Sequence, residues 1–155
     1  MRSTLAAATL ALAAIMTGPG FVQAAAAGSV PALQSPAETL PRPADEALRT
    51  GMTTLREMVA VRLQDDAAQA MTEADYVALA GEIERQVGSI VAGRDFHNPA
   101  GRHLQWLLGD ITDGAGLMRS SPRIPGKRMG LLRVVETLNF YGREYDHPGW
   151  LALKP

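Results

Sequence analysis

The stretch NPAGRHLQWLLGDITDGAGLMR, residues 98–119, places apolar side chains at intervals of three and four residues. Asn98 followed by Pro99 is typical of a helix N-cap and the first helical position. The apolar positions that fall on one face are Leu104, Leu107, Leu108, Ile111, Ala115 and Met118. Because this spacing matches the 3.6-residue period of an α-helix, we expect a helix over about 98–119 with one buried stripe.

Three glycines interrupt this predicted helix, at Gly109, Gly114 and Gly116. Each costs about 1 kcal/mol of helix stability relative to alanine. Either the neighbouring helices approach closely at these positions, or the helix is locally weak. The sequence alone leaves both explanations open.

Three further segments show the same helical period, over about 44–69, 72–92 and 126–146. In the second segment Thr72 is a candidate N-cap, and Asp75 completes a capping box. Alternating runs of β-branched residues, which are typical of strands, are absent. Four helices of similar length joined by short loops predict an all-α fold, an antiparallel up-down-up-down four-helix bundle.

The first 24 residues are typical of a secretory signal peptide. Arg2 supplies the positive n-region, residues 5–16 form an apolar core, and Val22–Ala24 offers a small-residue cleavage site. The apolar core has about twelve residues, whereas a membrane span needs roughly 20. We therefore expect cleavage after Ala24, export to the periplasm and no membrane attachment afterwards.

Residues 25–43 hold four prolines and no sustained period, which predicts a flexible leader before a single domain over 44–155. After cleavage the chain carries 14 basic and 16 acidic residues, a net charge of −2. This balance argues against a nucleic-acid partner. The chain has no cysteine, so disulfides, thiolate metal ligands, lipid attachment and covalently bound haem are excluded.

The predicted topology brings three histidines to one end of the bundle. That end combines the start of the first helix, the loop 93–101 and the end of the fourth helix, and it receives His97, His103 and His147. Imidazole nitrogens suit zinc and copper, so one interpretation is a Zn²⁺ or Cu²⁺ site formed by these three residues. The alternative is structural: a solvated loop histidine, one beside the apolar stripe and one at a helix C-terminus, where a protonated imidazole is favourable.

No catalytic constellation accompanies the histidines. Ser120 and Ser121 lie in the loop at the opposite end of the predicted bundle, so a Ser-His-Asp arrangement is not expected. The ligand pattern of di-iron bundles and the phosphate-binding glycine loop are missing. We therefore expect a non-catalytic protein, a monomer or homodimer, that binds a metal, a small ligand or an unknown periplasmic protein.

Three segments resemble the soluble b-type cytochromes, four-helix bundles that ligate haem through one methionine and one histidine. EALRTGMTTLREMV (46–59) places Met52 at the position of the ligating methionine, and RHLQWLLGDITDGAGLM (102–118) and LNFYGREY (138–145) resemble the third and last helices. The resemblance implies, as an alternative function, a haem-binding electron carrier with Met52 as a ligand of the cofactor. Gly142 stands at the position of the ligating histidine, which leaves that ligand set incomplete.

A second resemblance covers most of the chain that follows the signal peptide. LRTGMTTLR (48–56), QVGSIVAG (86–93) and LNFYGREYDHPGW (138–150) resemble the small exported proteins called DnrO-like, which are named after denitrification gene clusters. This resemblance implies a periplasmic helical bundle linked to nitrogen-oxide or redox metabolism. Arg94 stands near the place where that family often has a cysteine.

The C-terminal end gathers four of the eight aromatic residues of the chain within residues 139–150. Pro148 and Gly149 allow the chain to turn after the fourth helix. We therefore expect Trp150 to fold over the end of the bundle, as part of a C-terminal lid that shields apolar surface.

Overall fold

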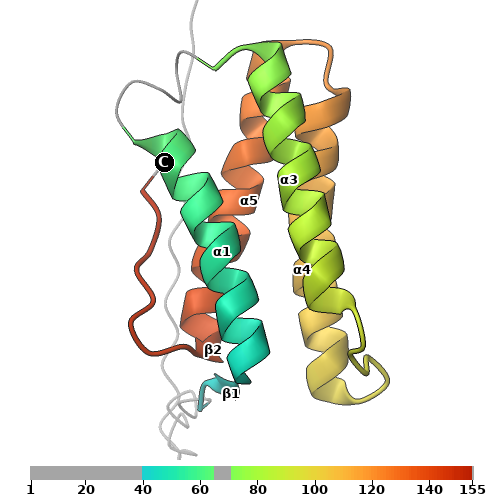
Figure 1. Ribbon diagram of the computed structural model, residues 1–155, viewed down its shortest axis with the longest axis vertical. Helices are drawn as coiled ribbons and strands as arrows, with labels where there is room; N and C mark the ends of the chain where they lie inside the picture. Colours follow the sequence, from blue (N-terminus) through green and yellow to red (C-terminus); the bar gives the residue numbers. More distant parts are fainter. Residues whose placement is uncertain (1–39, 65–70, 155) are drawn as a thin grey trace, which may run out of the picture. The chain divides into compact units, whose positions relative to one another are not determined.

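A computed structural model describes residues 40–64 and 71–154, and these are mostly helical (Figure 1). The predicted signal peptide and residues 25–39 of the predicted leader lie outside the described residues. The four helices of the described part are α1 (Glu46–Leu63), α3 (Glu73–Val91), α4 (Pro99–Ser120) and α5 (Ile124–Glu144). The all-α class is therefore confirmed for this part of the chain. None of these helices has the length and hydropathy of a membrane-spanning segment.

The two helix caps predicted at Thr72 and Asn98 are confirmed by their hydrogen bonds. The Asp75 backbone N–H donates to the Thr72 hydroxyl oxygen at 3.3 Å, and the Thr72 N–H donates to the Asp75 carboxylate at 2.9 Å, which forms the capping box. Asn98 caps α4 by accepting the Gly101 N–H at 2.7 Å, with proline in the first turn. Each bond satisfies an N–H group that the helix itself leaves unpaired.

The helix ends differ from the sequence prediction. The first helix ends at Leu63, and the backbone of Gln64 is extended. Residues 65–69, for which the period also predicted helix, lie outside the described residues. The last helix begins and ends two residues earlier than predicted. It ends at Glu144 because the backbone becomes extended at Tyr145. The spacing of apolar residues predicts the ends of a helix poorly, since the last turn has few apolar contacts.

A pair of very short strands was not predicted. β1 (Arg42–Pro43) pairs in parallel with β2 (Tyr145–Asp146), with Arg42 opposite Tyr145. Residues 42–43, the last two of the predicted flexible leader, therefore form a strand that the sequence pattern did not indicate. Two-residue strands are too short to show the alternation on which strand prediction depends. The pair joins the segment before α1 to the segment after α5.

The apolar stripes predicted for the helices form the core. All six positions of the 98–119 stripe are buried in α4, from Leu104 to Met118. Successive helices pack side by side, α1 on α3, α3 on α4 and α4 on α5, whereas α1 and α5 have few contacts with each other. The core therefore depends most on the α4–α5 contact.

Two glycines explain why α4 and α5 approach so closely. A Cβ atom on Gly130 would lie 2.5 Å from the Gly114 carbonyl oxygen, and one on Gly114 would lie 2.9 Å from the Gly130 carbonyl oxygen. Only glycine tolerates this approach of two backbones. The close-approach explanation is therefore confirmed at Gly114. It fails at Gly109 and Gly116, where an added Cβ would meet nothing within 4 Å.

The C-terminal segment 147–154 lies along the seam between α1 and α5 (Figure 1). The Asn139 side chain donates to the Leu153 carbonyl at 2.9 Å and accepts the Leu153 N–H at 2.7 Å. The Arg56 guanidinium donates to the Leu151 carbonyl from the other side of the seam. Leu153 itself is buried. The segment thus fills the gap that the sparse α1–α5 contact leaves in the core.

Candidate functional site

Two hydrogen-bonded pairs of histidine and tyrosine lie where α5 ends. His103 on α4 shares a hydrogen bond of 3.0 Å between its Nδ1 atom and the hydroxyl of Tyr145, the first residue of β2. His147 in the C-terminal segment shares one of the same length between its Nδ1 atom and the hydroxyl of Tyr141 on α5. The two tyrosine rings stack on each other, with centroids 4.8 Å apart and planes inclined by 20°. The four side chains therefore form one continuous group.

A threonine on α1 completes this group. The Nε2 atom of His147 lies 3.3 Å from the Thr53 hydroxyl oxygen. Both ring nitrogens of His147 thus have partners, one on α5 and one on α1. Since α1 and α5 have few direct contacts, His147 is one of the side chains that joins them.

Burial determines the protonation state of the group. Burial lowers the pKa of His103, and the nearby Arg42 guanidinium lowers it further. Burial also lowers the pKa of His147, with Arg49 acting in the same direction. Both imidazoles therefore stay neutral further below pH 7 than an exposed histidine does. The same desolvation raises the pKa of both tyrosine hydroxyls, so they keep their protons.

The structure gives the three predicted metal ligands different surroundings. His97 lies exposed in the loop before α4. Its backbone N–H donates to the Asp95 carboxylate at 2.8 Å, and its backbone carbonyl accepts from the Arg102 side chain. His103 and His147 are each held by a different tyrosine. Within residues 40–64 and 71–154, no group of three or more histidine, aspartate or glutamate side chains is arranged to hold a metal ion. The Zn²⁺ or Cu²⁺ site stays a prediction from the sequence.

The positions that the b-type cytochrome resemblance assigns to haem do not fit that group. Met52 is completely buried in the apolar core. At Gly142, an added Cβ atom would overlap the Trp150 indole, with its Cγ atom at 2.9 Å. The place of the second haem ligand is therefore filled by a side chain of the protein itself. Trp150 also packs edge-on against Tyr141, with the ring centroids 4.9 Å apart.

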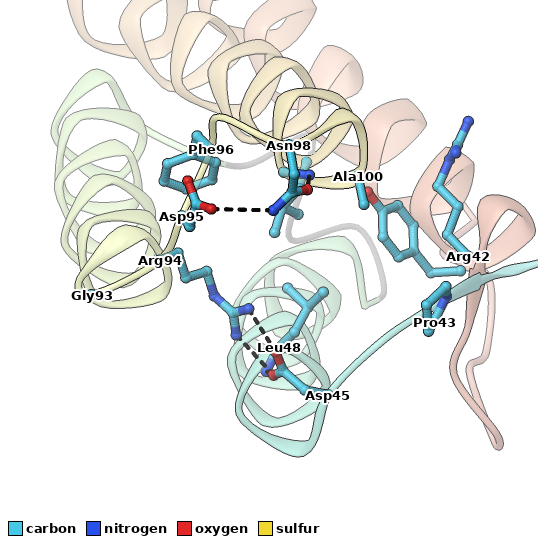
Figure 2. A pocket seen from close by; sticks show the side chains of 13 residues that line it. Arg42, Pro43, Asp45, Leu48, Gly93, Arg94, Asp95, Phe96, Asn98 and Ala100 are labelled. Atoms are coloured by element: carbon cyan, nitrogen blue, oxygen red, sulfur yellow. Dashed lines mark hydrogen bonds and ion pairs between the residues drawn. The ribbon is translucent and has the colours of Figure 1, made fainter.

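A cleft of about 400 Å³ lies beside this group, between the start of α1 and the 93–101 loop (Figure 2). Figure 2 shows the Arg94 guanidinium reaching across to Asp45, with two hydrogen bonds of 2.8 and 2.9 Å. These bonds hold the pKa of Asp45 down to about 2. Asp45 also accepts the Leu48 N–H as the N-cap of α1. Arg94 thus links the 93–101 loop to the N-terminus of α1.

The exposed face of α4 and α5 differs from this end. Trp106 is 58% exposed, and its ring lies edge-on to Phe140, with the centroids 5.8 Å apart, and 6.0 Å from the ring of His103. Farther along the same helices, Leu117 is 40% exposed and Met129 is 62% exposed. We call Trp106, Phe140, Leu117 and Met129 the α4–α5 face. Trp106 falls between the core positions of its helix, so its exposure was recognisable from the sequence, although it was not among the predicted site residues.

A charged cluster separates the two apolar ends of this face. The Arg133 guanidinium donates to Asp110 at 2.9 Å and to Asp113 at 3.2 Å. Thr137 also donates to the Asp110 carboxylate. Gly109 lies beside these residues and leaves the surface of α4 without a side chain there. The face is therefore apolar at both ends and charged in the middle.

Comparison of the chain with protein-family models, with curated proteins and with solved structures gave no match.

Proposed function

We propose that this chain is an exported, non-catalytic protein that acts by binding another protein through the α4–α5 face. In this proposal the signal peptide is cleaved after Ala24, the mature chain resides in the periplasm, and its helices form an up-down-up-down antiparallel bundle. The charged n-region, short apolar core and small-residue cleavage site support export. The order of helix contacts and the pairing of β1 with β2 support the bundle topology.

The exposure of Trp106 is the observation that carries the proposal. Tryptophan is enriched at the centres of protein interfaces, and exposed apolar side chains that gather on one face mark an interaction surface more strongly than scattered ones do. Trp106 and Leu117 are eleven residues apart on α4, as are Met129 and Phe140 on α5. Eleven residues are three helical turns, so the two apolar ends lie about 16 Å apart.

This spacing defines the kind of partner that fits. A helix with apolar side chains at positions i and i+11 would cover both ends of the face. A polar or charged residue between them would meet Arg133 and the exposed carboxylate of Asp113. The open, flat surface at Gly109 lets the backbone of such a helix approach α4 closely.

The other candidate surface is less suited to binding. The cleft beside the tyrosines is lined by charged groups that already have partners in the chain, above all Arg94 and Asp45. A small polar ligand would have to replace those hydrogen bonds. A link to nitrogen-oxide or redox metabolism, and the alternative of a haem-binding electron carrier, rest on the two resemblances.

Site-specific photo-cross-linking tests the proposal in the producing cell. One variant carries a benzophenone amino acid in place of Met129, at the edge of the face, and the control carries it in place of Val61 on α1. The two native residues are 62% and 63% exposed, so the positions are matched for access. We expect a discrete cross-linked product from position 129 and none from position 61.

A second substitution makes the result specific. Trp106→Ala should remove the product at position 129, because loss of an interface tryptophan typically costs 2 kcal/mol or more, about 30-fold in affinity. Mass spectrometry identifies the partner, and binding of the purified pair is then measured with and without Trp106. Equal cross-linking from both positions, or a product that survives Trp106→Ala, would contradict the proposal.

A further inference from the structure

Tyr141 and Tyr145 are phenols that burial keeps protonated, because it raises the pKa of both hydroxyls. Tyr141 is completely buried and Tyr145 is 5% exposed. A phenolate in such surroundings would lose its hydration, and this loss outweighs the attraction of the nearby arginines, so the pKa of each hydroxyl is raised. Each hydroxyl nevertheless has an imidazole nitrogen at 3.0 Å, which is within the range for direct proton transfer. The phenolic proton therefore has one short route out of each ring.

From this geometry we infer that Tyr141 and Tyr145 form a redox-active pair, which gives one electron to a one-electron oxidant while a histidine takes the proton. The phenol gives one electron to the oxidant, which is thereby reduced. The phenolic O–H bond breaks, and the proton moves to Nδ1 of the hydrogen-bonded histidine. The products are a neutral tyrosyl radical and an imidazolium ion. When an electron returns, the proton goes back to the phenol oxygen.

The surroundings of His147 favour this direction of transfer. A neutral imidazole carries one N–H and one free nitrogen, and the hydrogen bond on one side determines which is which. In the tautomer that carries the proton on Nε2, the Thr53 hydroxyl oxygen accepts from Nε2–H and Nδ1 accepts from the Tyr141 hydroxyl, and proton transfer to Nδ1 requires this tautomer. Burial keeps the imidazole neutral at pH 7, so that it is able to receive a proton.

Stacking distinguishes this pair from a single buried tyrosine. The parallel rings at 4.8 Å allow the oxidised state to be shared between Tyr141 and Tyr145, and each ring has its own proton acceptor. Tyr145 lines the cleft of Figure 2, which gives a small oxidant access to one ring. Trp150 packs against the outer side of Tyr141 and shields it.

Tyr76 provides an internal comparison. It is the other tyrosine of the chain and is 1% exposed, but it lies on α3. If burial alone made a tyrosine oxidisable, Tyr76 would behave like the pair. If proton transfer to His103 or His147 is required, the radical forms on Tyr141 and Tyr145.

Flash photolysis of the full-length mature protein tests the inference. Photogenerated tris(bipyridine)ruthenium(III) serves as the one-electron oxidant, and electron paramagnetic resonance distinguishes tyrosyl from tryptophanyl radicals. We expect a tyrosyl signal that is kept in Tyr76→Phe and lost when Tyr141→Phe and Tyr145→Phe are combined. His147→Gln and His103→Gln should each reduce the signal, because a glutamine can accept the hydrogen bond but is too weak a base to take the proton.

A measurement on the unaltered protein guards against variants that fold poorly. Oxidation should be slower in D₂O, because the O–H bond breaks as the electron leaves. A signal carried by Tyr76 or Trp106 would overturn the inference, as would a rate that is the same in H₂O and D₂O. Partner binding through the α4–α5 face is measured separately, so that proposal stands whichever result is found.

Discussion

The two tryptophans of this chain lie near the same group of aromatic residues and have opposite surroundings. Trp150 is partly buried against Gly142 and contacts both Tyr141 and His147. Trp106 is 58% exposed and touches the edge of Phe140. The first is held in place by the chain itself, and the second presents its surface to solvent. An exposed aromatic side chain that does little for the fold is the stronger indication of binding.

Removing each indole in turn should give the largest contrast. Trp150→Ala leaves a cavity between α5 and the C-terminal segment, and we expect it to lower the free energy of unfolding by about 3 kcal/mol. Trp106→Ala should lower it by less than about 1 kcal/mol, since most of that side chain is already in water. Urea denaturation followed by circular dichroism measures both variants. Similar losses from the two would show that Trp106 is a structural residue.

The contact between Gly142 and Trp150 gives the next largest effect. Gly142→Ala forces the indole away from α5, and overpacking of this kind costs about 1–3 kcal/mol. The cost should largely disappear when Trp150→Ala is already present, because the clashing side chain is then gone. A double-mutant cycle in urea measures this coupling. Strictly additive losses would mean that the indole does not depend on the glycine.

Much of the fold was predictable because it depends on local patterns. The core stripe from Leu104 to Met118 and the caps at Thr72 and Asn98 follow from spacing within a single helix, and all are present. The β1–β2 pair was missed because it joins residues about a hundred positions apart through only two residues each. Backbone hydrogen bonds between such short segments leave no periodic signal in the sequence.

The candidate site was predictable only in part. The sequence singled out His103 and His147, but not the tyrosines that bind them. Tyr141 and Tyr145 are four residues apart, one on the last turn of α5 and one after its end, and their stacking depends on where the helix stops. The sequence prediction placed that end two residues too late. The role of Arg94 was missed for a similar reason, since its partner Asp45 is 49 positions away.

Replacing either of two glycines of α4 by alanine should change the stability by a smaller amount, and in opposite directions at the two positions. Gly114→Ala should destabilise the protein, because the new Cβ would lie 2.9 Å from the Gly130 carbonyl oxygen. Gly109→Ala should stabilise it by about 0.5–1 kcal/mol, since alanine is the better helix former and nothing lies within 4 Å. Thermal unfolding measures both. If the α4–α5 face binds a helix at close range, Gly109→Ala should weaken partner binding while it strengthens the fold.

The pH dependence of stability should show the smallest effect. It concerns the end of the molecule that holds His103, His147 and Asp45. Burial lowers the pKa of His103 and His147 below the ordinary value of 6.5. The unfolded chain therefore binds protons first, and the stability from these neutral histidines is present above pH 6.5 and is lost as pH falls below it. Asp45 acts in a separate window, because its pKa of about 2 lies below the ordinary 3.8, so its contribution is lost only as pH falls from about 4 towards 2. The urea midpoint of the native sequence should thus be lower at pH 5.5 than at pH 7.5. The two midpoints should agree more closely when His103→Gln and His147→Gln are combined. Val61→Ala, at a position on α1 that is 63% exposed, serves as the control and should keep the native difference. A difference that survives the double histidine variant would assign the titration to other groups.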